Sequence, residues 1–219
     1  MKRLLIYVEG QTEETFVRDL LAPHLWTLGL HPEPTLARTK RTKSGLTFKG
    51  GITSYARVKN DISRLLGDRG AAGVSTMLDY YHLPGDFPGK ANLPPGSCFD
   101  RVRHLENRFR DDIDHPAFLP FLTLHEFEAL LFSQPEQIEA AFPDLHLKDR
   151  MSLEALPFAS PEEINEGEST HPAARIAKHI PAYRKRVHGP LIAERIGLDI
   201  IRSKCSHLDT WLTRLESLA

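Results

Sequence analysis

The feature that most constrains the fold is the apolar run RLLIYV at residues 3–8, which is followed directly by Glu9 and Gly10. An unbroken, partly β-branched run of this length is typical of a strand buried on both faces of a parallel sheet. A helical pattern comes next, and its apolar face consists of Phe16, Val17, Leu20, Leu21 and Leu25. Gly29 is expected to end this helix.

The order of strand and helix repeats along the first half of the chain. We expect helices at 54–66 and 97–110 and strands at 73–79 and 118–124, the last interrupted or placed at a sheet edge by Pro120. This alternation predicts an α/β fold with a mostly parallel sheet flanked by helices.

Two further segments extend this core. Residues 80–96 hold four prolines and three glycines, a composition that forbids a regular element and is typical of a functional or mobile loop. Residues 136–219 have helical patterns broken by prolines. We therefore expect an α/β core over residues 1–135 and a helical C-terminal extension over residues 136–219 that packs on it.

Length and composition are those of an ordinary globular protein. The 219 residues are 41% hydrophobic and 26% charged, which excludes collagen-like and disordered chains. No apolar run approaches the roughly 20 residues of a membrane-spanning helix, so we expect no membrane partner. Cys98 and Cys205 are the only cysteines and form no disulfide framework, which indicates a reducing, cytoplasmic location.

The net charge of −1 conceals strong segregation along the chain. Residues 1–110 have a net charge of +6, residues 111–170 of −12, and residues 171–219 of +5. Two basic ends around an acidic middle would suit a polyanion held beside a metal site. An acidic surface balanced by basic faces explains the same pattern equally well.

Carboxylates follow three of the predicted strands. Glu9 ends the first, Asp79 ends the strand at 73–79, and Glu126 and Glu128 follow the strand at 118–124. Because the carboxyl ends of parallel strands share one edge, where chemistry collects in α/β sheets, we expect these acids to converge. Glu13, four residues after Glu9, can approach the same point. Hard oxygen ligands of this kind suit Mg²⁺ or Mn²⁺.

Four of these five acids also have an ordinary structural explanation. Glu13 lies in the first turn of a helix, where the helix dipole favours acids. A single Asp at a strand end, such as Asp79, is often a helix cap or turn residue. Glu126 and Glu128 could be solvated helix residues.

Basic residues that could hold phosphates are spread over several segments. The candidates for nucleic-acid binding are Arg38, Lys40, Arg41, Lys43, Arg175, Arg202 and Lys204. Arg184, Lys185 and Arg186 form a further tight cluster. A solvated surface accounts for such runs at least as readily. Arg175, Arg202 and Lys204 could line the same cleft as Asp79, or could pair with the acidic middle of the chain.

The string VEGQTEE at residues 8–14 resembles the first motif of toprim domains, in particular those of the OLD (overcoming lysogenization defect) nucleases. These share a strand, then Glu-Gly-x-(Ser/Thr)-Glu-Glu, then a helix. Strings over almost the whole chain resemble a narrower family, catalogued as domain of unknown function 4276. The most specific of them is HEFEALLF at residues 125–132, which is expected to begin a helix.

The toprim resemblance implies a four-stranded parallel sheet and Mg²⁺-dependent cleavage of phosphodiester bonds, with Glu9 as ligand or general acid/base. The second toprim motif is Asp-x-Asp. Here Asp79 keeps the first acid and Tyr81 stands at the second position. Either Glu126 or Glu128 replaces the missing ligand, or metal binding is weaker, or catalysis is lost; Asp86 is a further candidate ligand.

The predicted site therefore has two overlapping sets of residues. The metal ligands would be Glu9, Glu13, Asp79, Glu126 and Glu128. The catalytic residues would be Glu9, Glu13, Asp79, Glu126 and His125. His125 could orient a phosphate or relay a proton, and is as well explained as a helix-capping residue.

Three functional hypotheses follow. The first is a metal-dependent nuclease, acting on DNA rather than RNA, in a bacterial anti-phage system with a separate ATPase subunit, since the sequence has no phosphate-binding Gly-x-x-x-x-Gly-Lys-Ser/Thr loop. The second is a non-catalytic binding or regulatory partner of such an ATPase. The third is an RNA-processing enzyme. The sequence leaves open whether the chain forms a homodimer.

Overall fold

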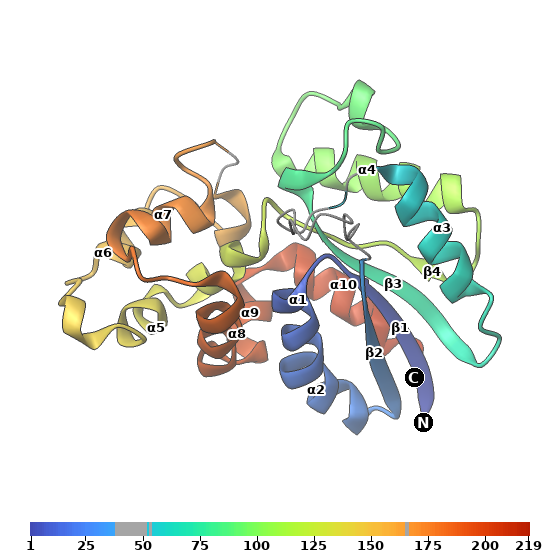
Figure 1. Cartoon of the computed structure of the whole chain (residues 1–219), viewed down its shortest axis with the longest axis horizontal. Coiled ribbons are helices and arrows are strands. Elements are labelled where there is room, and N and C mark those ends of the chain that lie inside the picture. Colours follow the sequence, from blue (N-terminus) through green and yellow to red (C-terminus); the bar gives the residue numbers. More distant parts are fainter. Residues whose placement is uncertain (38–51, 53, 165–166) are drawn as a thin grey trace, which may run out of the picture.

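The computed structural model describes residues 1–37, 52, 54–164 and 167–219 and has the predicted α/β architecture (Figure 1). The strands are β1 Lys2–Val8, β2 Leu30–Leu36, β3 Ala71–Asp79, β4 Phe118–Leu119 and β5 Leu122–Thr123. The α-helices are α1 Gln11–Phe16, α2 Ala22–Thr27, α3 Tyr55–Leu66, α4 Cys98–Ile113, α5 Pro135–Ala140, α6 Arg150–Ala155, α7 Pro172–His179, α8 Lys185–Ile196, α9 Leu198–Lys204 and α10 Ser206–Glu216.

In the described residues the sheet is parallel, as predicted, but it has five strands where four were expected. The strand order is β2-β1-β3-β4, and β5 pairs with β3 beyond β4. Val8 lies beside Met77, so that β1 and β3 run towards the same edge. The predicted strand at 118–124 is split into β4 and β5, because Pro120 has no N–H to give to the ladder. At this break the Thr76 hydroxyl in β3 replaces the ladder hydrogen bonds. It accepts from the Phe121 N–H at 2.9 Å and donates to the Phe121 carbonyl at 2.8 Å.

Helices cover both faces of the sheet, which explains the unbroken apolar run in the sequence. Alternate β1 residues point to opposite faces. Leu4, Ile6 and Val8 belong to a core shared with α1, α2 and α8–α10, whereas Leu5 and Tyr7 belong to a core shared with α3 and α4. Figure 1 shows α3 and α4 on the side of the sheet opposite to α1, α2 and α10.

The first predicted helix is confirmed, with one local change. It runs from α1 to α2 through a π-helical turn at Val17–Leu21 and ends before Gly29, whose φ of 82° is left-handed. The helix predicted from residue 125 begins two residues later and is of the 3-10 type. His125 has a φ of 60°, and the helix, η4, spans Phe127–Ser133, whose seven residues are all buried.

The C-terminal part contributes to the same core as the sheet. Ile138, Met151 and Ile176, from α5, α6 and α7, join the core that contains Leu4 and Ile6. α10 packs directly on the sheet, and the indole N–H of Trp211 donates to the Ser75 hydroxyl in β3 at 2.8 Å. Among the described residues, no helix has both the length and the apolar character needed to span a bilayer.

The two chain ends lie next to each other. The Lys2 ammonium donates to the carbonyls of Leu218 and Ala219, at 3.1 and 3.0 Å. Figure 1 shows both termini beside the start of β1, at the end of the sheet opposite to the strand ends that bear the acids.

Candidate functional site

Five acidic residues gather where β1, β3 and β5 end. Glu9 follows β1, Asp79 is the last residue of β3, and Glu13 lies in the first turn of α1. Glu126 and Glu128 flank the start of η4 after β5. All are buried except Glu9, which is partly buried.

Backbone N–H groups fix two of the carboxylates. The Glu9 Oε2 atom accepts from the Asp79 N–H at 3.2 Å, and the Asp79 Oδ1 atom accepts from the Phe127 N–H at 3.1 Å. The split of the predicted strand into β4 and β5, followed by the left-handed His125, brings the start of η4 against the end of β3. The backbone at the end of β3 and at the start of η4 therefore fixes the positions of the Glu9 and Asp79 carboxylates.

A lysine from α8 lies among these carboxylates. The Lys185 Nζ atom is 3.1 Å from Asp79 Oδ2, 3.1 Å from Glu128 Oε2 and 3.7 Å from Glu13 Oε1. The Tyr183 hydroxyl donates to Glu128 Oε1 at 3.2 Å. Three acids from three elements thus converge on one point, and a cation occupies it.

Gly189 allows α8 to approach closely enough to place this lysine. A Cβ atom at Gly189 would lie 3.2 Å from Phe127 Cε1, 3.3 Å from the Tyr183 hydroxyl and 3.4 Å from Thr12 Cγ2. A side chain there would require these neighbours to shift by a few tenths of an ångström. Glycine thus permits the closest approach of α8 to α1 and η4, one turn after Lys185.

The electrostatics of the cluster are dominated by an excess of acid. Burial, together with the charges of Asp79 and Glu13, raises the pKa of Glu9 to about 8. Burial likewise raises the pKa of Glu13 to about 6 and that of Glu128 to about 7, and raises the pKa of Asp79 above its usual range. A single ammonium does not neutralise these carboxylates, so the cluster favours the binding of additional protons or of a further cation.

Lys185 itself stays charged. Burial opposes the charge, but the carboxylates of Asp79, Glu128 and Glu13 outweigh that penalty and hold its pKa well above the usual value. The ammonium and the acids therefore stabilise each other across α8, β3 and η4.

Glu126 belongs to an outer layer of the same site. Its Oε1 atom is 2.8 Å from His171 Nδ1 and accepts from the Ala173 N–H at the start of α7. The ring of Tyr81 stacks on His171, with centroids 5.4 Å apart and an interplanar angle of 24°. Tyr81, at the position of the missing second acid, is thereby linked to Glu126 through an imidazole.

The acids open into a cavity of about 600 Å³. Arginines from the start of α8 line the same cavity as the carboxylates, so positive charge faces the acidic floor. The lining residues are Glu9, Gly10, Gln11, Thr12, Glu13, Asp79, His82, Glu126, Arg184, Lys185, Arg186 and Val187.

The donor set fits a divalent metal ion by its chemistry and its charge. Carboxylate oxygens are the ligands that Mg²⁺ and Mn²⁺ prefer, and those of Glu13, Asp79 and Glu128 already converge. Their arrangement is built around the ammonium: within the described parts of the chain, no group of three or more His, Cys, Asp or Glu side chains has the geometry of a metal site.

Other predicted site residues have different surroundings. His125 is buried with its ring edge-to-face against Tyr80, at a centroid distance of 6.1 Å, and does not line the acidic cavity. Asp86 accepts from the Tyr55 N–H at the start of α3, at 3.1 and 3.2 Å.

The basic candidates are used elsewhere or lie outside the description. Arg175 pairs with Glu154 at 2.8 Å, in the acidic middle of the chain, and its guanidinium lies 5.0 Å from the Phe158 ring centroid. Arg202 pairs with Asp209 at 2.7 Å and with Glu216, and Lys204 is exposed at the end of α9. The remaining candidates, which lie outside the described residues, are Arg38, Lys40, Arg41 and Lys43.

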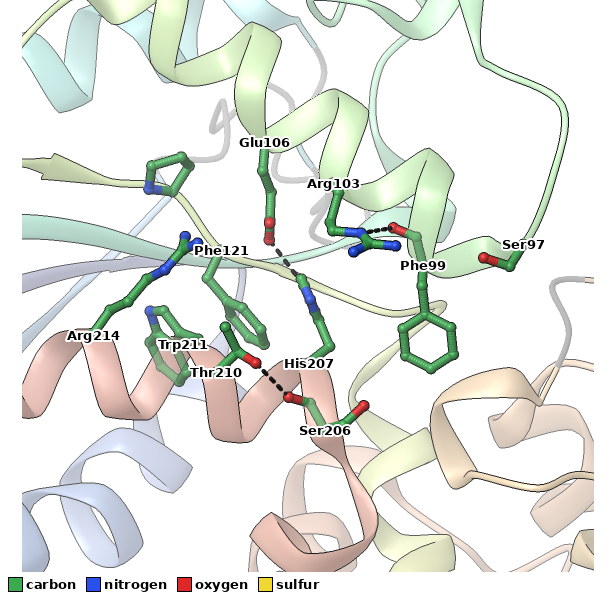
Figure 2. Close-up of a pocket in the computed structure, with 11 residues that line it drawn as sticks. Ser97, Phe99, Arg103, Glu106, Phe121, Ser206, His207, Thr210, Trp211 and Arg214 are labelled. Carbon is green, nitrogen blue, oxygen red and sulfur yellow. Dashed lines mark hydrogen bonds and ion pairs between the residues drawn. The ribbon is translucent and has the colours of Figure 1, made fainter.

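A second cavity, of about 490 Å³, lies between α4 and α10 (Figure 2). Its floor is a set of mutually satisfied groups. Glu106 accepts from the Leu122 N–H at 2.9 Å and pairs with His207 at 3.0 Å, while Phe121 stacks on Trp211 with centroids 4.2 Å apart. These contacts hold α10 against α4 and β5. We therefore interpret the residues around this cavity as stabilising the packing of these elements.

Sequence reasoning did not place Lys185, Tyr183 or His171 in the acidic site. In the sequence, Arg184-Lys185-Arg186 is only a cluster of positive charge, and local spacing cannot show which of its members turns inward. The only usable signal was the large acidic excess of residues 111–170 next to a basic C-terminal segment.

Comparison with known proteins gives one finding. No curated protein and no solved structure matches the chain. One family model does match, over residues 8–216, which include the whole acidic cluster and Lys185. The chain therefore belongs to the family described as Domain of unknown function (DUF4276).

Proposed function

We propose that the protein is a metal-dependent nuclease, related to toprim enzymes, that hydrolyses phosphodiester bonds in nucleic acid. The observation that carries the proposal is the convergence of Glu9, Glu13, Asp79 and Glu128 at the carboxyl edge of a parallel sheet. This is the edge at which open α/β sheets bind ligands, and the excess negative charge calls for a cation. The VEGQTEE motif, which resembles the first toprim motif, supplies two of these acids.

A bound Mg²⁺ or Mn²⁺ would supply Lewis acidity for a phosphoryl oxygen and a more acidic water molecule. Glu13, Asp79 and Glu128 would hold it. Glu9, whose carboxylate is held beside these ligands by the Asp79 N–H, would act as the general acid that gives a proton to the leaving oxygen. Arg184 and Arg186, on the same cavity, can pair with flanking phosphates.

The proposal includes a setting, which rests on the resemblance to OLD nucleases. DNA is the proposed substrate, and a separate ATPase is the proposed partner in defence against phage. An RNA substrate would instead support an RNA-processing enzyme.

A cleavage assay tests the proposal. Labelled DNA and RNA, each single- and double-stranded, are incubated with MgCl₂ or MnCl₂ and with the wild type, Glu9→Ala or Asp79→Ala. We expect metal-dependent cutting by the wild type and its loss in both variants. Cutting that persists in both variants would come from a contaminant and would count against the site.

A non-catalytic partner of an ATPase is the second candidate. It is favoured by Tyr81 at the place of the second acid and by the ammonium of Lys185 inside the cluster. Absence of cutting by the wild type, both alone and after addition of an ATPase encoded beside it, would favour this candidate over the nuclease.

A further inference from the structure

Lys185 occupies the point that a metal ion would need. Its ammonium is within 3.1–3.7 Å of one oxygen each from Glu13, Asp79 and Glu128. Mg²⁺ binds carboxylate oxygens at about 2.0–2.1 Å and demands near-octahedral geometry. To bind all three carboxylates, an ion would have to draw their oxygens inward into the space that the Nζ atom now fills, so the two cations exclude each other.

The side chain has a route out of the cluster. Lys185 is the first residue of α8, and 35% of its side chain is exposed, in contrast to 3% for Glu13 and Asp79 and 0% for Glu128. It also lines the cavity of about 600 Å³. Rotation of its flexible stem would therefore move the ammonium into solvent without a movement of the α8 backbone, and would leave the carboxylates free to close around an ion.

We propose that Lys185 is a tethered cation that competes with the divalent ion for Glu13, Asp79 and Glu128, and thereby sets the metal affinity of the site. The inference rests on the proposed function, since it concerns the same metal. Without metal, the ammonium holds the acids together. When metal binds, the ammonium leaves the cluster, and the free energy needed to displace it weakens the metal affinity of the site.

Arg186 provides a matched control. It is the next residue of α8, carries the same charge, lines the same cavity and is exposed, and it forms no ion pair with the acids among the described contacts. Replacing it changes the local charge by the same amount without removing the competitor.

Isothermal titration of the metal-free proteins with MgCl₂ and with MnCl₂ tests the inference, on the wild type, Lys185→Met and Arg186→Met. Methionine keeps the length of the stem and removes the charge. We expect the Kd of Lys185→Met to be at least about tenfold lower than that of the wild type, because a close cation is lost. Arg186→Met should change Kd by less than about threefold, since water and salt screen an exposed charge.

The outcomes separate this inference from the proposed function. If the wild type binds metal and Lys185→Met binds it equally or more weakly, the competition is refuted and the metal site survives. Weaker binding would mean that the ammonium and the metal are bound together. If no protein binds metal, the proposed function fails, and the inference fails with it.

A measurement on the wild type decides the matter if Lys185→Met does not fold. Acetylation of Lys185 by acetic anhydride is followed by mass spectrometry with and without MgCl₂, and exposed Lys178 is the internal reference. Displacement predicts that MgCl₂ accelerates acetylation of Lys185 relative to Lys178 several-fold. An unchanged or slower relative rate would overturn the proposal.

Discussion

The metal-free protein should become less stable as the pH rises from about 5.5 to about 8, and replacing Glu9 by Gln should abolish much of this loss. Burial and the charges of Asp79 and Glu13 raise the pKa of Glu9 to about 8 in the folded state, against an ordinary value of 4.5. The folded state therefore keeps a proton that the unfolded chain releases. Stability falls with rising pH over the interval between the two pKa values, and metal-free folding is favoured on the acid side.

The magnitude follows from the linkage between proton binding and folding. One proton costs about 1.4 kcal/mol per pH unit, so Glu9 alone accounts for about 3 kcal/mol between about pH 5.5 and about pH 8. Gln cannot ionise, and its carbonyl can still accept from the Asp79 N–H. Removing one negative charge also eases ionisation of Glu13 and Asp79, which acts in the same direction.

Urea unfolding, followed by tryptophan fluorescence in EDTA at constant ionic strength, measures this effect. Glu128 and His207, whose pKa values are also raised, contribute to the pH slope of both proteins. The difference between the two curves therefore reports the loss of the Glu9 carboxyl together with its effect on Glu13 and Asp79. Glu136→Gln, which removes an exposed acid of α5, should keep the wild-type slope. Curves for Glu9→Gln and wild type that stay parallel within about 0.5 kcal/mol would refute the argument.

Three further predictions concern the scaffold. Glu106→Ala leaves the buried Leu122 N–H and His207 without their acceptor and should lower the free energy of unfolding by about 3–5 kcal/mol in urea, and a loss below about 1 kcal/mol would contradict the role of this pair. Trp211→Phe keeps an aromatic ring against Phe121 but loses the hydrogen bond to Ser75, so calorimetry should show a loss of about 1 kcal/mol or more, and an unchanged Tm would argue against that bond. Gly89→Ala should lower the free energy of unfolding by at least about 1–2 kcal/mol, because φ is +81° and the new Cβ would lie 2.8 Å from Arg108 Cγ and His104 Nε2. Gly85→Ala, whose Cβ would meet open space, is the control. Equal stability of the two variants would count against this reasoning.

The part of the site that the sequence predicts is the part that follows from strand order. Glu9 and Asp79 end neighbouring parallel strands, so their proximity needs only the hydrophobic runs before them and the rule that such strands share an edge. Glu13 follows from helical spacing. The position of Glu128 needed one correction: η4 is buried on every side and therefore shows no amphipathic pattern from which its 3-10 form could be inferred.

The position of Lys185 among the acids could not be predicted from the sequence. It lies 106 residues after Asp79, and its direction is decided by the packing of α8 on α1 and η4 through Gly189. No local periodicity encodes such a contact. Likewise, Arg175 and Arg202 look like ligands for phosphate in the sequence, and only the tertiary structure shows that Glu154 and Glu216 already pair with them.

The neighbouring chain ends determine how the molecule would present itself when attached to a surface. Both termini lie at the start of β1, where Lys2 contacts Leu218 and Ala219, whereas the acids lie beyond the opposite end of the strand. The seven residues of β1 separate the two by about 20 Å. A tag or tether at either end would therefore point the acidic cavity away from the support. Immobilised protein would therefore keep the cavity open to molecules in solution, including ones too long to fit between the protein and the support.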